Sequence, residues 1–352
     1  MTVPSTMRAY RLLGWEQPPE VVEVPVPEPG AGEVLVEVAG NGLCHSDITM
    51  RQMPAAFGEA VGWAMPFTLG HEVGGRVAAT GDGVDGLADG EPVALVSPSS
   101  CGRCWWCTRG LDGTCPHGLV GRGYGADGGL ADYVLVNDVR AVLPIGGLDP
   151  VHAAPLTDAG ATSHHAVARV ASRLDDDAAV AVVIGTGGLG ALALQLLRAL
   201  TPAQVIAVDT NEARLAYARE LGAHHTVIGV DGDTRAQLAS ITGGEGAHAV
   251  LDFVGVDDTI AAGVASVRPA GAFALVGAGN GTLHAPWMHG LPREAEVFTF
   301  QGSNIADAQA VLQLAGDGRI RADVDRFSFD QIDDAYAAME AGTLRGRAVI
   351  TP

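Results

Sequence analysis

Five cysteines are the residues of this chain whose type and spacing most clearly predict chemistry. Four of them follow the pattern C-x2-C-x2-C-x7-C in the segment CGRCWWCTRGLDGTC, namely Cys101, Cys104, Cys107 and Cys115. Thiolates at such short spacing in a loop can supply all the ligands of a closed structural zinc site. The remaining one, Cys44 in GLCHSD, lies far upstream and predicts a second, open metal site that must take its other ligands from His, Asp or Glu.

Disulfides and buried, unreactive thiols are the alternatives for these cysteines. The N-terminal segment MTVPSTMRAYRLLG has no apolar stretch typical of a signal peptide, and no run of about 18 apolar residues could span a bilayer. We therefore expect a cytoplasmic protein whose thiols stay reduced, which favours zinc over disulfides for the group of four. For Cys44 alone, the spacing leaves open the commoner fate of an inert buried thiol.

The composition indicates a soluble globular α/β protein and argues against two classes of partner. The chain has 352 residues, a length typical of two domains, and 47% of them are apolar. Lys and Arg number 21 against 41 Asp and Glu, which gives a net charge of −20. Because a field of that sign repels polyanions, we expect no nucleic-acid partner and no anionic membrane surface.

Two kinds of sequence pattern divide the chain. Residues 1–150 contain short β-branched or alternating runs, such as EVLVEVAG and LADYVLV, which predict an antiparallel, barrel-like β domain. From about residue 179 to 300, apolar strands alternate with amphipathic helices, as in AVAVVIG followed by LGALALQLLRAL. This alternation predicts βαβ units around a parallel sheet. The remaining C-terminal residues are mixed in pattern, and we expect them to fold back onto the first domain.

A glycine-rich turn after the strand AVAVVI predicts a dinucleotide site. Residues 185–190 read Gly-Thr-Gly-Gly-Leu-Gly, which is G-x-G-x-x-G between a strand and a helix. Gly185 permits the tight turn, Gly187 lets a pyrophosphate approach the backbone, and Gly190 lets helix and strand pack closely. Asp209, at the end of the next strand, can bind the adenosine ribose and would repel a 2′-phosphate. The prediction is therefore NAD rather than NADP.

The segment TLGHEVGG places His71 and Glu72 at the end of a strand-like segment. A lone histidine of this kind is more often a hydrogen-bonded core residue than a ligand. Together with other segments, however, it carries a resemblance. GLCHSD, GHEVGGRV, the cysteine-rich lobe, LTDAG, VVIGTGGLG, VIAVD, LDFVG and RGRAVI cover nearly the whole chain. In these motifs the chain resembles the zinc-dependent alcohol dehydrogenases of the medium-chain dehydrogenase/reductase superfamily, and within it the bacterial secondary-alcohol and broad-range NAD-dependent members.

The resemblance implies an α/β protein with two domains. A GroES-like β-barrel catalytic domain would span residues 1–157 and carry the structural zinc lobe at 97–118. A Rossmann domain with a doubly wound parallel sheet would bind NAD over residues 158–300, and residues 301–352 would return to the catalytic domain. The family also implies two zinc ions per subunit, one structural and one catalytic. Its bacterial members are mostly homotetramers, with homodimers as the alternative.

The resemblance also implies roles at the catalytic zinc. Cys44 and His71 would be ligands, and since the other cysteines belong to the lobe, Asp158 of LTDAG would be the third. Glu72 would lie behind these ligands and approach the metal when water or product leaves. Asp47 would accept the second ring N–H of His71 and fix its tautomer.

Proton transfer and cofactor binding complete the implied site. Ser46 would take the proton of the alcohol, and since Thr49 replaces the usual terminal histidine, His45 or water would complete the relay. The implied NAD contacts are Gly185, Gly187, Gly188, Leu189 and Gly190 on the pyrophosphate side, Asp209 and Arg214 at the ribose, His45 and Arg345 near the pyrophosphate, and Thr162, Val254 and Val276 around the nicotinamide. Trp63 would line the substrate pocket.

The function implied is the reversible, NAD-linked oxidation of an alcohol to a ketone or aldehyde, with hydride leaving an alkoxide held by zinc. Secondary alcohols are the leading substrates, and polyols or primary alcohols are the alternatives. A zinc-free reductase of the same superfamily is disfavoured by Cys44, His71 and Asp158. A non-enzymatic zinc-binding interaction protein is disfavoured by the net charge and by the dinucleotide motif.

Overall fold

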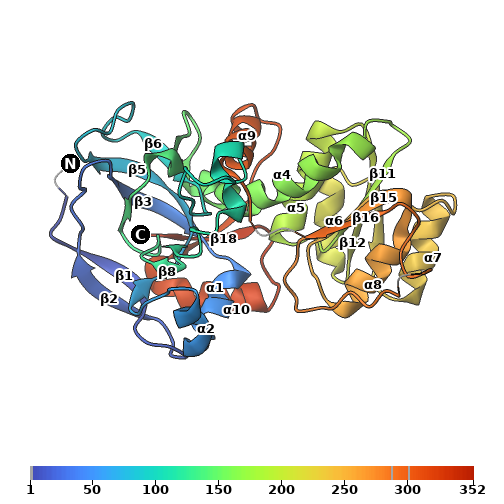
Figure 1. Ribbon diagram of the computed structural model, residues 1–352, viewed down its shortest axis with the longest axis horizontal. Helices are drawn as coiled ribbons and strands as arrows, with labels where there is room; N and C mark the ends of the chain where they lie inside the picture. Colours follow the sequence, from blue (N-terminus) through green and yellow to red (C-terminus); the bar gives the residue numbers. More distant parts are fainter. Residues whose placement is uncertain (1–2, 287, 300–301) are drawn as a thin grey trace. The chain divides into compact units, whose positions relative to one another are not determined.

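The computed structural model describes residues 3–286, 288–299 and 302–352 and divides into two compact units (Figure 1). The first unit comprises Met1–Ala161 and Gly302–Pro352, and the second comprises Thr162–Gln301. The second predicted domain begins at residue 158, and the structure keeps residues 158–161, with the start of the following helix, in the first unit. The other predicted boundary, between 300 and 301, lies outside the described residues.

The first unit is built on a seven-stranded sheet. Its order is β10-β6-β5-β3-β18-β17, with β9 also paired to β3, and all its pairs are antiparallel except β17 with β18. The strands are β3 (Val34–Gly42), β5 (Glu72–Thr80), β6 (Pro92–Leu95), β9 (Tyr133–Val136), β10 (Val142–Pro144), β17 (Val324–Ser328) and β18 (Arg347–Thr351). A second sheet has the order β2-β1-β4, from Glu20–Pro25, Thr6–Leu12 and Phe67–Thr68. This unit confirms the predicted GroES-like domain.

Short helices and turns connect these strands in the first unit. The α-helices are α1 (His45–Arg51), α2 (Ala55–Ala60), α3 (Pro150–Ala153), α9 (Ile305–Gly316) and α10 (Ile332–Glu340), and α4 (Ala159–Val170) continues into the second unit. The cysteine-rich lobe contains two single 3-10 turns, η1 (Cys107–Arg109) and η2 (Asp112–Thr114), and it is followed by the strand pair β7 (Gly121–Arg122) and β8 (Gly125–Ala126). Three more 3-10 turns are η3 (Val139–Ala141), η4 (Ala154–Thr157) and η6 (Phe329–Gln331).

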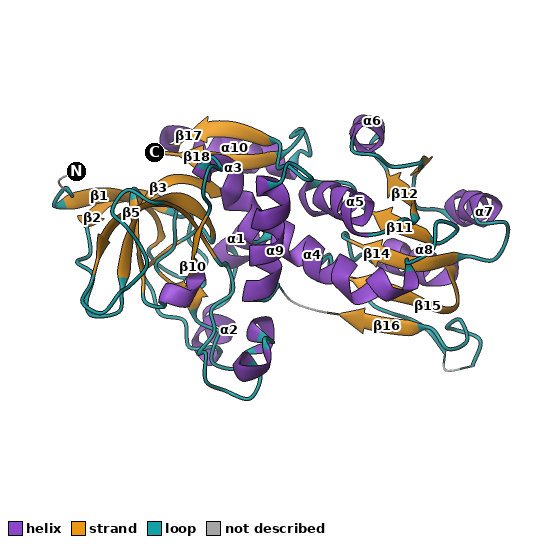
Figure 2. Cartoon of the chain, turned by 90° about the horizontal axis from the view of Figure 1, so that it is seen from above, coloured by secondary structure: helices purple, strands orange, loops and turns teal. Residues whose placement is uncertain are grey.

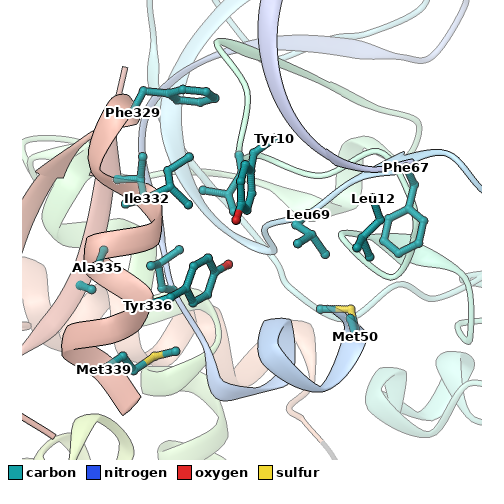
Figure 3. Packing of buried hydrophobic residues seen from close by; sticks show 14 residues of the cluster. Tyr10, Leu12, Met50, Phe67, Leu69, Phe329, Ile332, Ala335, Tyr336 and Met339 are labelled. Atoms are coloured by element: carbon teal, nitrogen blue, oxygen red, sulfur yellow. The ribbon is translucent and has the colours of Figure 1, made fainter. Parts of the chain in front are cut away.

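The C-terminal helix α10 closes the hydrophobic core of the first unit (Figure 3). Its buried residues Ile332, Ala335, Tyr336 and Met339 recur at the i, i+3, i+4, i+7 spacing of one helix face. They join Tyr10, Leu12, Met50, Phe67 and Leu69 from the N-terminal half of the chain. The residues of α10 that complete this core are more than 250 positions away in sequence from many of their partners. Their packing against Met50 and Phe67 fixes the positions of α1 and β4.

The second unit is a parallel sheet of six strands with the order β13-β12-β11-β14-β15-β16 (Figure 2). The strands are β11 (Val180–Ile184), β12 (Gln204–Asp209), β13 (His225–Ile228), β14 (Ala247–Asp252), β15 (Val267–Leu275) and β16 (Glu296–Thr299). They alternate with α5 (Gly188–Leu200), α6 (Glu212–Glu220), α7 (Gly232–Ile241) and α8 (Asp257–Ser266), and η5 (Ala171–Arg173) follows α4. The strand order reverses between β11 and β14, so the predicted Rossmann fold is confirmed.

Candidate metal and cofactor sites

The four clustered cysteines gather their sulfur atoms as the spacing predicts. One ligand atom from each of Cys101, Cys104, Cys107 and Cys115 lies within 4.8 Å of the others. Sγ of Cys104 is 3.4 Å from Sγ of Cys107, and all four are free thiols rather than disulfides. Hydrogen bonds, the strongest from the backbone of Arg103, lower the pKa of Cys101 to about 6, which favours the thiolate that a metal requires. The donor set and its geometry fit a structural zinc ion.

A second group of possible ligands lies at one end of the first sheet. Cys44, His71, Glu72 and Asp158 each offer one ligand atom, and these atoms lie within 4.8 Å of one another. Cys44 directly precedes α1, His71 and Glu72 stand at the start of β5, and Asp158 links η4 to α4. The structure therefore brings together the residues proposed as ligands from the sequence, although they come from three separate segments.

Glycines make this assembly possible. A Cβ atom on Gly42, at the end of β3, would lie 2.0 Å from Oε2 of Glu72 on the paired strand. Gly70 precedes His71 with φ +96, a left-handed conformation that other residues rarely adopt. Backbone atoms of Gly70 also lie within 3 Å of where side chains on Gly123 and Gly128 would begin. The absence of side chains at these positions lets three chain segments meet behind the ligands.

His71 is held from both sides of its ring. On one side, Nδ1 lies 3.3 Å from Oδ1 of Asp47, within ion-pair range, and Oδ2 of Asp47 accepts a 2.9 Å hydrogen bond from the backbone N–H of Cys44. On the other side, Nε2 lies 3.7 Å from Oδ2 of Asp158. With Asp47 occupying the Nδ1 side, Nε2 is the nitrogen that faces the ligand group.

Electrostatics favour anionic ligands around His71. Burial raises the pKa of Asp158, but the hydrogen bond and charge of His71 outweigh it and bring the pKa to about 2. Burial likewise raises the pKa of Cys44, yet the hydrogen bond from His71 leaves it below the ordinary value. Burial lowers the pKa of His71, while Tyr124, Asp47 and Asp158 raise it well above normal. A buried site with a carboxylate and a thiolate is one that a divalent cation neutralises.

Glu72 forms a buried ion pair that the sequence analysis missed. A guanidinium nitrogen of Arg347 pairs with Oε1 of Glu72, and neither side chain is more than 8% exposed. Oε2 of Glu72 has no hydrogen-bond partner among the described residues. One oxygen of Glu72 is therefore paired with a cation, and the carboxylate lies within reach of the ligand group, as a carboxylate that exchanges onto a metal requires.

Arg345 of the motif RGRAVI, expected near the cofactor pyrophosphate, is not one of the residues of the ligand group. Arg345 precedes β18, and its backbone N–H donates to Asp325 at 3.1 Å. With His152 and Asp323 it lines a shallow cavity of about 310 Å³ in the first unit. Arg347, two residues later, is the arginine that enters the site. Strand alternation in the sequence could not separate the two arginines, because residues two apart on a strand share a face. Arg345 lies before β18 begins, whereas Arg347 is its first residue.

The residues expected to move a proton lie on α1, and a tyrosine joins them. Oγ of Ser46 is 3.5 Å from Nε2 of His71 and 3.1 Å from the hydroxyl of Tyr124, which itself is 3.1 Å from Nε2. His45 is exposed at the start of the helix, and Thr49 reaches back to its carbonyl at 3.5 Å. Tyr124 was missed because its glycine-rich segment, GRGYGADGG, carries no ligand spacing.

Trp63, expected at the substrate pocket, packs beside Tyr124. The ring centroids of Trp63 and Tyr124 are 6.3 Å apart. Trp63 also contacts Phe67, with 5.9 Å between the ring centroids. The indole N–H donates to the carbonyl of Leu119 at 2.8 Å. Trp63 thus supports Tyr124 from behind and ties the segment after α2 to the segment after the cysteine lobe.

The glycine turn of the second unit has the geometry of a dinucleotide loop. Gly185 has φ +82, and a Cβ atom on Gly190 would lie 1.9 Å from the carbonyl oxygen of Gly185. Gly187 is the N-cap residue of α5, and the space above it is free up to the guanidinium of Arg214, about 4.0 Å from where its Cβ would be. The three glycines therefore have the conformations and the free space that the turn, approach and packing roles of the motif require.

Asp209 closes this loop from the neighbouring strand. Its Oδ2 accepts hydrogen bonds from the backbone N–H and the hydroxyl of Thr186, at 2.7 and 3.0 Å, and its Oδ1 accepts from the backbone of Asn211 at 2.9 Å. The side chain is almost completely buried, with 5% of the residue exposed. Asp209, Thr186 and Arg214 therefore lie together at the carboxyl end of the sheet.

The other cofactor residues predicted in and next to the second unit lie at the same sheet edge or in the helices α4 and α5. Val254 follows β14 and Val276 follows β15; a Cβ atom on Gly277, next to Val276, would lie 2.4 Å from the backbone nitrogen of Val254. Leu189, in the first turn of α5 beside Gly188, accepts a 2.8 Å hydrogen bond from Ser163. Thr162 precedes Ser163 and is largely buried.

Within the described residues, no helix is long and apolar enough to cross a membrane.

Comparison with known sequences finds the same two parts. The family described as alcohol dehydrogenase GroES-like domain matches residues 30–146, and the family described as zinc-binding dehydrogenase matches residues 188–317. An NAD-dependent alcohol dehydrogenase of Sulfurisphaera tokodaii is 32% identical over 98% of this chain and 100% of its own length. A D-arabinose 1-dehydrogenase (NADP(+)) of Saccharolobus solfataricus is 28% identical, covering 98% of this chain and 97% of its own.

Solved structures match over the same extent. The alcohol dehydrogenase of the hyperthermophilic archaeon Aeropyrum pernix is 33% identical, with a TM-score of 0.90 over 98% of this chain and 100% of its own. The acetophenone reductase of Geotrichum candidum, solved in complex with NAD, is 28% identical, with a TM-score of 0.88 over 100% and 99%. The similarity thus covers both units rather than one shared domain.

Proposed function

Because the chain belongs to the zinc-containing alcohol dehydrogenases of the medium-chain dehydrogenase/reductase superfamily, we propose that it reversibly oxidises secondary alcohols to ketones, with NAD as hydride acceptor. Membership establishes the enzyme class, an NAD-dependent alcohol dehydrogenase with a four-cysteine structural zinc site and a catalytic zinc site. The choice of substrate and the roles of individual residues form the proposal.

The observation that carries the proposal is the buried convergence of Cys44, His71 and Asp158. A thiolate, a neutral imidazole and a carboxylate carry two negative charges, which balance those of Zn²⁺. Three protein ligands with an open position distinguish a catalytic zinc site from a closed structural one. Glu72 would remain paired with Arg347 and exchange onto the metal through Oε2.

Residues of this chain then have separate roles in proton transfer, in orienting the ligand group and in binding NAD. When bound, zinc supplies a Lewis acid that stabilises negative charge on the substrate oxygen. Ser46 accepts the proton that the alcohol releases, and Asp47 keeps Nε2 of His71 directed at the ligand group. In the second unit, the glycine turn and α5 would hold the pyrophosphate, and Asp209 and Arg214 the adenosine ribose.

The preference for secondary alcohols has two supports. The Geotrichum relative is named for acetophenone, a ketone whose reduction gives a secondary alcohol. In addition, Tyr124 places an aromatic ring beside Ser46, and Trp63 packs against that ring. This aromatic surface suits an apolar substituent better than a polyhydroxylated chain. The rival substrate is a sugar with NADP, as in the arabinose dehydrogenase; against it stands Asp209, whose carboxylate would repel a 2′-phosphate.

A substrate panel with metal analysis tests the proposal. We expect two zinc ions per chain and a higher kcat/KM for 2-butanol with NAD than for its isomer 1-butanol, for D-arabinose, or for any of them with NADP. C44S should lose one zinc ion and the activity. Two zinc ions and undiminished turnover in C44S would refute the ligand assignment, whereas faster oxidation of D-arabinose with NADP would refute the substrate assignment.

Assembly and location are also proposed. We infer a homotetramer in the cytoplasm, with a homodimer as the alternative. Apolar side chains exposed on and beside the cysteine lobe, including Trp105, Leu111 and Leu119, support contact between subunits there. Light scattering after size exclusion should give four times the 36.0 kDa of one chain; a mass of one chain would exclude any such assembly.

A further inference from the structure

Tyr124 places a phenol hydroxyl among the reacting groups without being a metal ligand. The hydroxyl lies 3.1 Å from Nε2 of His71 and 3.1 Å from Oγ of Ser46. Its ring centroid is 4.6 Å from that of the imidazole. Tyr124 therefore contacts both the nitrogen that faces the ligand group and the hydroxyl expected to take the substrate proton.

The position of this hydroxyl is fixed by the backbone. Tyr124 sits between Gly123 and Gly125, whose φ angles are +72 and +79, and its amide and carbonyl are both hydrogen-bonded to Gly121. A side chain on Gly123 would begin 2.7 Å from the carbonyl oxygen of Gly70, just before His71. Because this turn is packed backbone to backbone against the segment that carries His71, the phenol and the imidazole keep their relative positions.

The ring is supported from behind as well. Trp63 lies 6.3 Å from it, and a side chain on Gly125 would begin 2.5 Å from the indole of Trp63. The ring of Tyr124 thus has packing partners that do not involve its hydroxyl. Loss of the hydroxyl alone should leave the packing in place, so the contribution of the hydroxyl can be measured separately.

A zinc ion held by the ligand group would change the hydrogen-bond partners of the Tyr124 hydroxyl. The lone pair of Nε2 that faces Tyr124 is the one that a zinc ion at the ligand group would take, and His71 then can no longer accept a hydrogen bond. The phenol would retain Ser46 and face whatever oxygen occupies the open position. Resting on the proposed function, we propose that Tyr124 is a catalytic residue that donates a hydrogen bond to the substrate oxygen, alongside Ser46.

Ligand binding without turnover tests the inference. The probe is propionamide, a carbonyl compound that the enzyme cannot reduce, titrated into the zinc-loaded enzyme with NADH. Y124F should retain two zinc ions and its affinity for NADH, yet bind propionamide about tenfold more weakly, as the loss of one hydrogen bond predicts. The matched control is Y133F, which removes a hydroxyl from strand β9 opposite Glu37 and should bind propionamide like the wild type.

A second measurement needs no variant. In a crystal structure of the wild type with NADH and propionamide, the hydroxyl of Tyr124 should lie within about 3.2 Å of the amide oxygen. A clearly longer distance between these two oxygen atoms, or unchanged propionamide affinity in Y124F, would overturn the role of Tyr124. The proposed function would still stand in that case if the wild-type enzyme oxidised alcohols. A wild type without zinc-dependent alcohol oxidation would overturn both.

Discussion

The buried ion pair between Arg347 and Glu72 allows a quantitative prediction. The two side chains are 8% and 0% exposed, and Glu72 stands beside two further acids of the ligand group, Cys44 and Asp158. R347M replaces the guanidinium by an apolar side chain of similar length. It leaves the carboxylate of Glu72 buried in the same place without its cation.

The expected cost follows from that burial. Removing one partner of a buried ion pair typically destabilises a protein by about 3–5 kcal/mol, because the remaining charge stays desolvated. Exposed pairs contribute only about 0–1 kcal/mol. R321M is therefore the matched control: Arg321 pairs with Asp323 at 2.9 Å in the same unit, but its side chain is 61% exposed.

Urea denaturation of the zinc-loaded proteins, followed by tryptophan fluorescence, measures the difference. We expect R347M to lose about 3–5 kcal/mol of unfolding free energy and R321M about 1 kcal/mol or less. The double variant E72Q/R347M removes both charges and should recover a large part of the loss. If R347M unfolded within about 1 kcal/mol of the wild type, or if E72Q did not rescue it, removing Arg347 would not leave Glu72 as a buried, uncompensated charge.

Three further predictions concern other parts of the chain. C104S should release the structural zinc and lower thermal stability while one zinc ion remains bound, whereas loss of both ions on metal analysis would show that the two sites are not independent. D47N should weaken catalytic zinc about 10–100-fold in chelator competition, because His71 loses the partner that orients it; unchanged affinity would contradict that role. Burial raises the pKa of Asp252 in the folded protein above its ordinary value. Between these two pKa values the folded protein binds a proton at Asp252 that the unfolded protein has released. The stability of the fold therefore falls as pH rises through this range. D252N should lack this part of the pH dependence. If the unfolding free energy, measured by urea denaturation, changed with pH equally in the wild type and D252N, the assignment to Asp252 would be contradicted.

Short-range features were predictable from the sequence. The four lobe cysteines span only 15 residues, so a loop of that length can hardly avoid bringing their sulfur atoms together. The turn from Gly185 to Gly190 is equally local, because a strand, a tight turn and a helix N-terminus follow one another directly. In both cases the chemistry is encoded by neighbours in the chain, and no distant contact has to be known.

Contacts between distant segments were not predictable in the same way. Arg347 and Glu72 are separated by 275 residues, and they meet because β18 and β5 both pair with β3. Tyr124 reaches His71 only through the packing of Gly123 and Gly128 on Gly70. The sequence singled out Arg345 for the cofactor pyrophosphate, and only the position of β18 shows that Arg347 pairs with Glu72.

By itself, then, the sequence determined that this chain holds a four-cysteine metal lobe and a dinucleotide turn, and it named Cys44, His71 and Asp158 through a resemblance. Only the tertiary structure decided that these three residues share one buried site, that Glu72 is neutralised by Arg347, and that Tyr124 stands over His71. The physical reason is that ligand spacing and turn chemistry are local properties of a chain. The pairing of strands and the close approach of glycine backbones depend on the whole fold.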